Sequence, residues 1–128
     1  LKPVLLLEAQ VCLIKNVSKG DYIGYNRTYL SKDNFKVAII QIGYADGVPI
    51  SLSNNYSVDY NGEKLSILGK VSMDLICIDI GKSKIKKGCK VIIFGSKNTR
   101  IDKLPKNIME SPYTILTSIS QRVKRIYK

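Results

Sequence analysis

Short apolar runs separated by turn residues follow one another along most of the chain and predict a protein built mainly of β-strands. Residues 8–17 form one such run. Residues 35–44 form another, with a continuous apolar centre that is typical of a strand buried on both faces. In residues 56–68, Asn61 and Gly62 separate two β-rich arms, which predicts a hairpin. Further strands are expected at residues 75–80, 89–95 and 121–127.

The stretch 75–80 is expected to alternate between buried and exposed positions, and residues 121–127 to close the chain as a last strand. Only residues 111–120 favour a helix, with Ser111 as N-cap and Pro112 at the first helical position. Its apolar face would be formed by Ile115, Leu116 and Ile119. Many short strands and one late helix predict a mostly β, compact β-barrel-like domain, with a sandwich as the alternative.

The length of 128 residues fits one domain, spanning residues 1–128, that can bury a core without metals or disulfides. The formal net charge is +11, and the densest lysine run lies at 82–90. Lysine is otherwise scattered, so we interpret the charge as a solvated surface and expect no nucleic-acid partner. The opening "LKPV" indicates a domain cut from a longer protein.

Cysteine and histidine content restricts the possible chemistry. Cys12, Cys77 and Cys89 lack metal-ligand spacing, and the chain contains no histidine, so we expect three small core side chains and no metal site. Without histidine, acid–base chemistry must use Tyr, Lys, Asp or Glu, or groups from a partner. The chain shows neither a signal peptide nor an apolar run long enough to span a membrane, and we expect a cytoplasmic location.

One tyrosine stands in an unusual local context. In "GDYIGYNRTY", residues 20–29, Tyr25 lies between Gly24 and Asn26, two residues suited to unusual backbone angles, and Arg27 follows. This pattern does not fit a core strand, and it places a phenol on a backbone bend beside a cation.

Three further positions are candidates, each with an ordinary structural explanation. Tyr44 in "GYADG" would cover a sheet edge at an Asp46-Gly47 turn, and Met73 in "GKVSMDL" would be core filler. Tyr113, in the first turn of the helix, would either pack against the domain or direct its hydroxyl at an anion. Taken singly, none of the three identifies a function.

Taken in order, these elements resemble one family. "LKPVLLLEAQV", "GYNRTY", "GYADGVP", "NGEKLSILGKVSMD" and "YTILTSISQRVKRIY" closely resemble the C-terminal domain of alanine racemases, from Leu1 to Tyr127. Family members join this β domain to an N-terminal TIM-like barrel domain, which carries pyridoxal phosphate on a lysine. They form head-to-tail homodimers in which the β domain of one subunit completes the active site of the other. The resemblance thus implies conversion of L-alanine to D-alanine for peptidoglycan.

The resemblance also implies residue roles. Tyr25 would be one of two catalytic bases, the other being the lysine of the N-terminal domain. The backbone N–H of Met73 would bind the substrate carboxylate, Tyr44 would line the substrate side, and Tyr113 would hydrogen-bond the cofactor phosphate. Asp74 would fix the loop that carries Met73.

The chain departs from the family pattern near the substrate channel. Lys70 and Ile50 replace arginines that are common in the family, Ser72 replaces a common cysteine, and Ser111 lies at another channel position. These changes leave open a racemase for serine or another amino acid. A β-barrel module that binds anionic partners through its basic surface is a second alternative. Since no βα repeat is present, we expect the isolated domain to be inactive.

Overall fold

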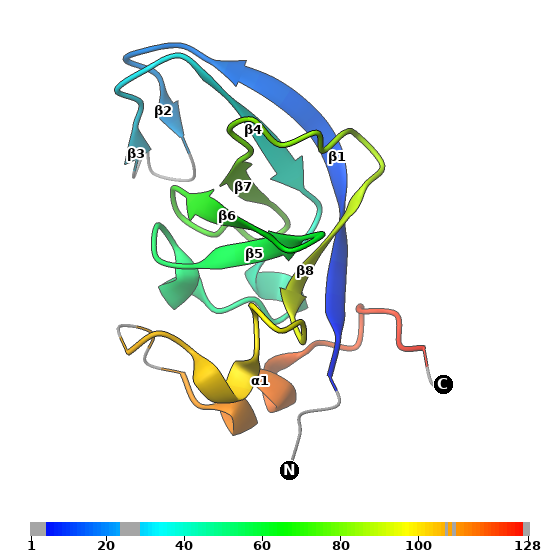
Figure 1. The fold of residues 1–128 in the computed structure, drawn as a ribbon. Coiled ribbons are helices and arrows are strands. Elements are labelled where there is room, and N and C mark those ends of the chain that lie inside the picture. Colours follow the sequence, from blue (N-terminus) through cyan, green and yellow to red (C-terminus); the bar gives the residue numbers. More distant parts are fainter. Residues whose placement is uncertain (1–4, 24–28, 107, 109, 127–128) are drawn as a thin grey trace.

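The apolar segments form a closed barrel of six antiparallel strands, in the order β1-β4-β7-β6-β5-β8 (Figure 1). The computed structural model describes residues 5–23, 29–106, 108 and 110–126. The barrel strands are β1 (Leu7–Val17), β4 (Phe35–Ile40), β5 (Ser57–Tyr60), β6 (Glu63–Leu68), β7 (Ile76–Asp79) and β8 (Lys90–Phe94). A small hairpin, β2 (Tyr22–Ile23) with β3 (Tyr29–Leu30), lies at one end of the barrel. The mostly β, barrel-like prediction is confirmed.

The long strand β1 joins two sides of the barrel. Its first part, from Leu7 to Gln10, pairs with β8, and its second part, from Val11 to Val17, pairs with β4. The register shifts between Val11 and Leu13. Such an irregularity bends a strand and increases its twist, which lets one segment serve both neighbours.

The predicted hairpin is confirmed between β5 and β6. Asn61 and Gly62 both adopt positive φ, 49° and 89°, as the favoured two-residue turn requires. A carboxylate oxygen of Asp59 accepts the Gly62 N–H at 3.0 Å and supports the turn.

Strand β7 differs from the expected alternation, because Ile76, Cys77 and Ile78 are all buried. The barrel interior covers one face. A second apolar cluster, which contains Val17 and Ile23, covers the other face beneath the β2–β3 hairpin. The same two-sided burial confirms the prediction for β4. Of the three cysteines, Cys77 is buried as expected, whereas Cys12 and Cys89 are only half-buried.

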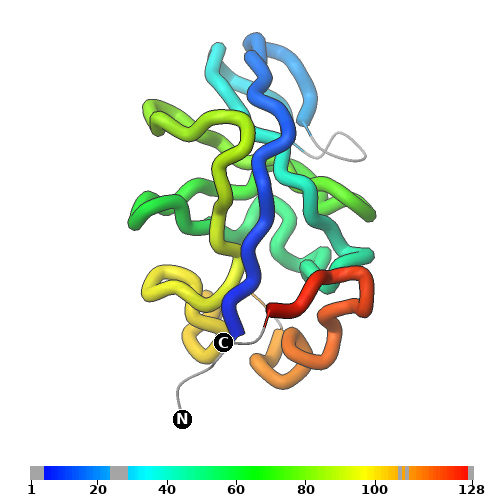
Figure 2. Tube along the Cα trace, turned by 90° about the vertical axis from the view of Figure 1, so that its right-hand side faces the viewer, coloured from blue at the N-terminus to red at the C-terminus, as the bar shows by residue number. Residues whose placement is uncertain are grey.

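The opposite end of the barrel is covered by α1 (Pro112–Ser118) and η3 (Ile101–Lys103), which insert Ile115 and Ile101 into the main core (Figure 2). The Ser111 hydroxyl accepts the Thr114 N–H at 3.0 Å, so the predicted N-cap is confirmed. Within the described residues, the helices are too short to be membrane-spanning segments.

Two expectations for the C-terminal segment are wrong. Leu116 is exposed, because the helix is short and only its Ile115 side packs on the barrel. The segment 121–126 forms turns and bends in place of a strand, since β8 and β1 already close the barrel and leave no edge for it to join.

Candidate functional site

The "GYADG" motif forms a compact turn directly after β4. Residues Tyr44–Asp46 make the short 3-10 helix η1, and a carboxylate oxygen of Asp46 accepts the Gly43 N–H at 2.9 Å across its base. Gly47 ends the turn with φ of 112°, a conformation that favours glycine. The predicted Asp46-Gly47 turn is confirmed, and Tyr44 lies on it with 45% of its surface exposed.

A second loop, between β6 and β7, is hydrogen-bonded to this turn. The Tyr44 N–H donates to the Ser72 carbonyl at 2.9 Å, and the Ala45 N–H donates to the Met73 carbonyl at 3.0 Å. The approach is so close that a β-carbon on Gly43 would overlap both carbonyl groups. This close approach explains the first glycine of the motif, whose φ of −153° suits any residue.

The Met73 loop is itself a tight turn. The Ser72 hydroxyl donates to the Leu75 carbonyl at 2.8 Å and accepts the Leu75 N–H at 3.1 Å. Met73 and Asp74 therefore project at its tip, where Met73 is 53% exposed. Within the described ranges, no hydrogen bond involves the Met73 N–H. The turn thus holds a backbone donor that has no partner within the described part of the chain, next to the Tyr44 turn.

A third segment, after α1, packs against both loops. The Gly47 backbone approaches Ser118 and Ile119 so closely that a β-carbon would lie 2.7 Å from the Ser118 carbonyl oxygen. The Ser120 N–H donates to the Asp46 carbonyl at 3.2 Å. Residues 43–47, 72–75 and 118–122 consequently meet near one end of the barrel.

Arg122, in this third segment, connects the two loops through their carboxylates. Its Nε lies 2.7 Å from Asp46 Oδ1, and its Nη2 lies 2.6 Å from Asp74 Oδ1. The hydrogen bond with Asp74 and the charges of both carboxylates raise the pKa of Arg122 above its ordinary value. The guanidinium is therefore always charged.

Comparison with known proteins decides the family. The family model "Alanine racemase, C-terminal domain" matches residues 4–127. The chain belongs to this family. It is 40% identical over 123 residues to the alanine racemase of Vesicomyosocius okutanii, covering 96% of this chain and 35% of the relative. It is 42% identical over 127 residues to that of Borreliella burgdorferi, covering 98% of this chain and 34% of the relative.

Solved alanine racemases share the fold. The structure from Bartonella henselae, with covalently bound pyridoxal phosphate, superposes with a TM-score of 0.89 at 37% identity, covering 96% of this chain and 34% of that one. The enzyme from Clostridium difficile 630 gives a TM-score of 0.91 at 33% identity, covering 100% of this chain and 34% of that one. The chain thus spans about a third of the length of these relatives.

In this alanine racemase C-terminal domain, two of the four expected site residues lie on adjacent loops. The four residues are Tyr25, Tyr44, Met73 and Tyr113. Tyr44 and Met73 lie on directly hydrogen-bonded loops. Tyr113 is in the first turn of α1 and is 77% exposed, and no hydrogen bond among the described residues links it to either loop. Tyr25, with its neighbours Asn26 and Arg27, lies outside the described residues.

Two positions expected to depart from the family pattern are described by the structure. The Ser72 hydroxyl closes the Met73 turn, so this serine has a structural role. Ile50, in η2 (Ile50–Leu52), exposes 47% of its surface as an uncharged side chain.

Sequence reasoning missed Arg122, because it assigned that segment to a strand. The ion pair with Asp74 spans 48 positions, and no spacing rule connects residues so far apart. The sequence offered only a weak indication of this contact. It shows a basic run after the helix, which includes Arg122, and two aspartates within motifs, Asp46 and Asp74.

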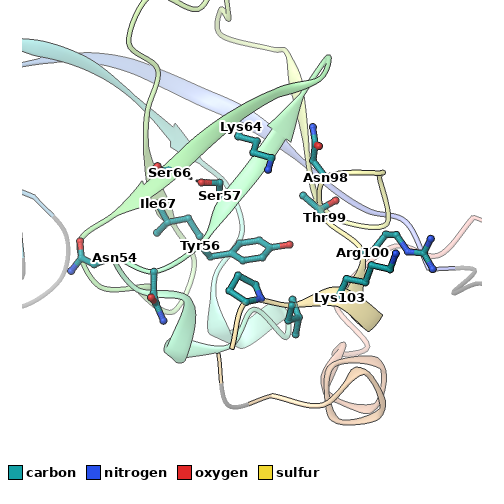
Figure 3. A pocket seen from close by; sticks show the side chains of 13 residues that line it. Asn54, Tyr56, Ser57, Lys64, Ser66, Ile67, Asn98, Thr99, Arg100 and Lys103 are labelled. Carbon is teal, nitrogen blue, oxygen red and sulfur yellow. Dashed lines mark hydrogen bonds between the residues drawn. The ribbon is translucent and has the colours of Figure 1, made fainter. Parts of the chain in front are cut away.

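A separate polar hollow of ≈ 480 Å³ lies beside the β5–β6 hairpin and η3 (Figure 3). It contains three cationic side chains, Lys64, Arg100 and Lys103, with Tyr56 at its floor. Arg100 is paired with Asp102 at 2.6 Å. No ion pair of Lys64 or Lys103 occurs among the described residues, so this hollow has a net positive character.

Proposed function

We propose that this domain completes the active site of a pyridoxal-phosphate-dependent alanine racemase, which interconverts L- and D-alanine. Family membership supports the reaction class. The observation that carries the proposal is the direct hydrogen bonding of the Tyr44 turn to the Met73 loop, two segments whose Tyr44 and Met73 residues are both exposed.

In this proposal Tyr25 exchanges the substrate Cα proton on one face, and a lysine of the N-terminal domain exchanges it on the other. A free phenol has a pKa of about 10, so Tyr25 needs cations or donors that stabilise its phenolate. The chain has no histidine, and such groups beyond the sequence neighbours of Tyr25 would come from the N-terminal domain.

The Met73 N–H would bind the substrate carboxylate. A fixed donor at that position orients the substrate, so that Cα lies between the two bases. The Tyr44 ring would line the substrate side of the same pocket, and the tight turn closed by Ser72 would keep the donor in place.

One residue of the domain fits the cofactor. Tyr113 is exposed, and no hydrogen bond of its hydroxyl occurs within the described part of the chain, so it is available to donate to a phosphate oxygen. When bound, pyridoxal phosphate supplies an electron sink for negative charge at Cα. The remaining contacts, including the lysine, would come from the N-terminal domain.

The proposed partners follow from the length of the relatives, of which this chain covers about a third. An N-terminal domain would complete the protein, and a head-to-tail homodimer would bring this domain to the active site of its partner. We expect the domain alone to be inactive, because the lysine that would carry the cofactor belongs to the N-terminal domain.

The decisive experiment joins this domain to the N-terminal domain of the Borreliella burgdorferi relative and compares Tyr25→Phe with the unchanged protein. Racemisation should collapse, while exchange of the Cα proton with solvent deuterium should persist for one enantiomer only, because the lysine base remains. Tyr29→Phe serves as a matched control and should racemise normally. Racemisation that survives Tyr25→Phe would refute the role of Tyr25.

The cationic hollow beside η3 favours a second function, the binding of an anionic partner (Figure 3). Binding that depends on Lys64 and Lys103 should weaken steeply as salt concentration rises. Titration of the domain with inorganic triphosphate, with and without Lys64→Ala and Lys103→Ala, tests this function. Identical affinities in both proteins would exclude it.

A further inference from the structure

We propose that Arg122 is a positioning residue for the substrate-carboxylate site, because it holds the Met73 loop in register with the Tyr44 turn. The inference rests on the proposed function for its consequence in catalysis. Its structural basis, the contact of one guanidinium with both loops, is independent of that function.

The two loops follow different strands of the barrel, β4 and β6. The hydrogen bonds from Tyr44 and Ala45 to the carbonyls of residues 72 and 73 join their backbones. Beyond these, the Arg122 bridge to Asp46 and Asp74 is the only ion-pair link between the two loops among the described residues. Asp74 directly follows Met73, so this bridge acts next to the proposed donor.

The Asp46 end of the bridge is firmly held. Its side chain is only 12% exposed, and both of its oxygens are used, one by Arg122 and the other by the Gly43 N–H. The Asp74 side chain is 54% exposed and sits on the projecting turn. Arg122 therefore transmits the position of a buried, fixed carboxylate to an exposed loop.

The segment that carries Arg122 is fixed as well. The Arg125 guanidinium donates to the carbonyls of Ile119 and Ser120 at 3.1 Å, and the Ser120 N–H donates to the Asp46 carbonyl. The arginine thus reaches both loops from a braced backbone. A free tail would in addition lose backbone conformational entropy when its side chain is held in this position.

Charge adds a second effect at the same place. Asp46 and Asp74 carry two negative charges near the proposed binding site of the substrate carboxylate, which is itself negative. The positive charge of Arg122 offsets one of these two charges. Without it, uncompensated like charges would oppose carboxylate binding at short range.

Arginine suits this role better than lysine. Its planar fork directs Nε to Asp46 and Nη2 to Asp74 in fixed directions, whereas an ammonium is a point charge on a flexible stem. Arg122→Lys should therefore restore the charge but only part of the alignment.

The test uses two measurements. In the joined protein, Arg122→Ala should raise the KM for alanine by about tenfold with a smaller change in kcat, and Arg122→Lys should give an intermediate KM. In the 128-residue chain, hydrogen exchange of the Tyr44 and Ala45 amides should accelerate about tenfold or more in Arg122→Ala, because the loops separate more often. Arg100→Ala, which removes the same charge from an ion pair with Asp102, is the matched control and should change neither quantity.

The outcomes distinguish the positioning role of Arg122 from the proposed racemase function. Unchanged exchange at Tyr44 and Ala45 in Arg122→Ala overturns the positioning role whatever the activity. An unchanged KM in an active variant overturns it also. A joined protein that does not racemise alanine overturns the proposed function, and the exchange measurement then still decides whether Arg122 holds the loops.

Discussion

The backbone N–H of Tyr44 donates a 2.9 Å hydrogen bond to the carbonyl of Ser72. This bond links the end of β4 to the connection between β6 and β7. Two motifs that are about thirty positions apart in the sequence therefore form one structural unit. A change at either loop is expected to displace the other.

Gly43 should tolerate no side chain. Gly43→Ala would place a β-carbon against the carbonyls of Ser72 and Met73, both of them backbone groups that cannot rotate away. Overpacking of this kind costs about 1–3 kcal/mol of unfolding free energy, which urea denaturation measures. Amide chemical shifts of residues 72–75 should move as well. Gly88→Ala, at a positive φ in open space, should leave those shifts unchanged, and equal shifts in both variants would contradict this account.

Tyr56 should stabilise the junction between β5 and β8. Strands β5 and β8 share the single register pair Asp59 and Ile92, and the buried Tyr56 hydroxyl adds a 2.7 Å hydrogen bond to the Ile93 carbonyl. Tyr56→Phe removes this buried hydrogen bond, and the expected loss of unfolding free energy is about 0.5–1.5 kcal/mol. Tyr60→Phe, a half-buried control, should cost less than about 0.5 kcal/mol. Equal stability of the two variants would show that the bond contributes nothing.

Tyr113 should affect cofactor binding and leave stability unchanged. Its side chain is 77% exposed, so Tyr113→Phe should shift the unfolding free energy by less than about 0.5 kcal/mol. In the joined protein, loss of one hydrogen bond to a phosphate should weaken pyridoxal phosphate binding about tenfold. Cofactor absorbance during dialysis measures the affinity. Full retention of the cofactor would argue against a phosphate contact.

The cysteines should react in a defined order. A backbone hydrogen bond at Lys86 and the Tyr60 hydroxyl, 3.6 Å from the thiol, lower the pKa of Cys89, whereas burial raises the pKa of Cys77 to about 12. The thiolate is the reactive form, so iodoacetamide should modify Cys89 first and Cys77 last.

The pH dependence of this reaction tests the cause. Removing the stabilising hydroxyl by Tyr60→Phe should raise the Cys89 pKa, because the thiolate loses a donor. The alkylation rate at neutral pH should then fall, and its rise should move to higher pH. A pH profile identical to that of the unchanged protein would contradict this assignment.

Local chemistry made several elements predictable. The Asn61-Gly62 turn needs two residues at positive φ, and Ser111 supplies the oxygen that the first helical turn needs; both features are local and both were predicted correctly. The course of residues 121–126 was not predictable in this way. Their pattern is compatible with a strand, but a strand needs a free edge, and β8 with β1 closes the barrel.

The candidate site likewise has features that the sequence predicts and features that only the fold reveals. The motif around Tyr44 and the Met73-Asp74 pair were visible as sequence, and their resemblance to alanine racemases indicated their importance. Their direct contact, and the bridge that Arg122 makes between Asp46 and Asp74, were not visible.

The sequence by itself determined the strands, the hairpin, the helix cap and the family, because these depend on side-chain pattern, turn chemistry and ordered motifs within short stretches. Only the tertiary structure decided which loops meet. The fold brings residues 43–47, 72–75 and 118–122 together, and an ion pair across 48 positions depends on the tertiary arrangement because no local pattern relates residues so far apart.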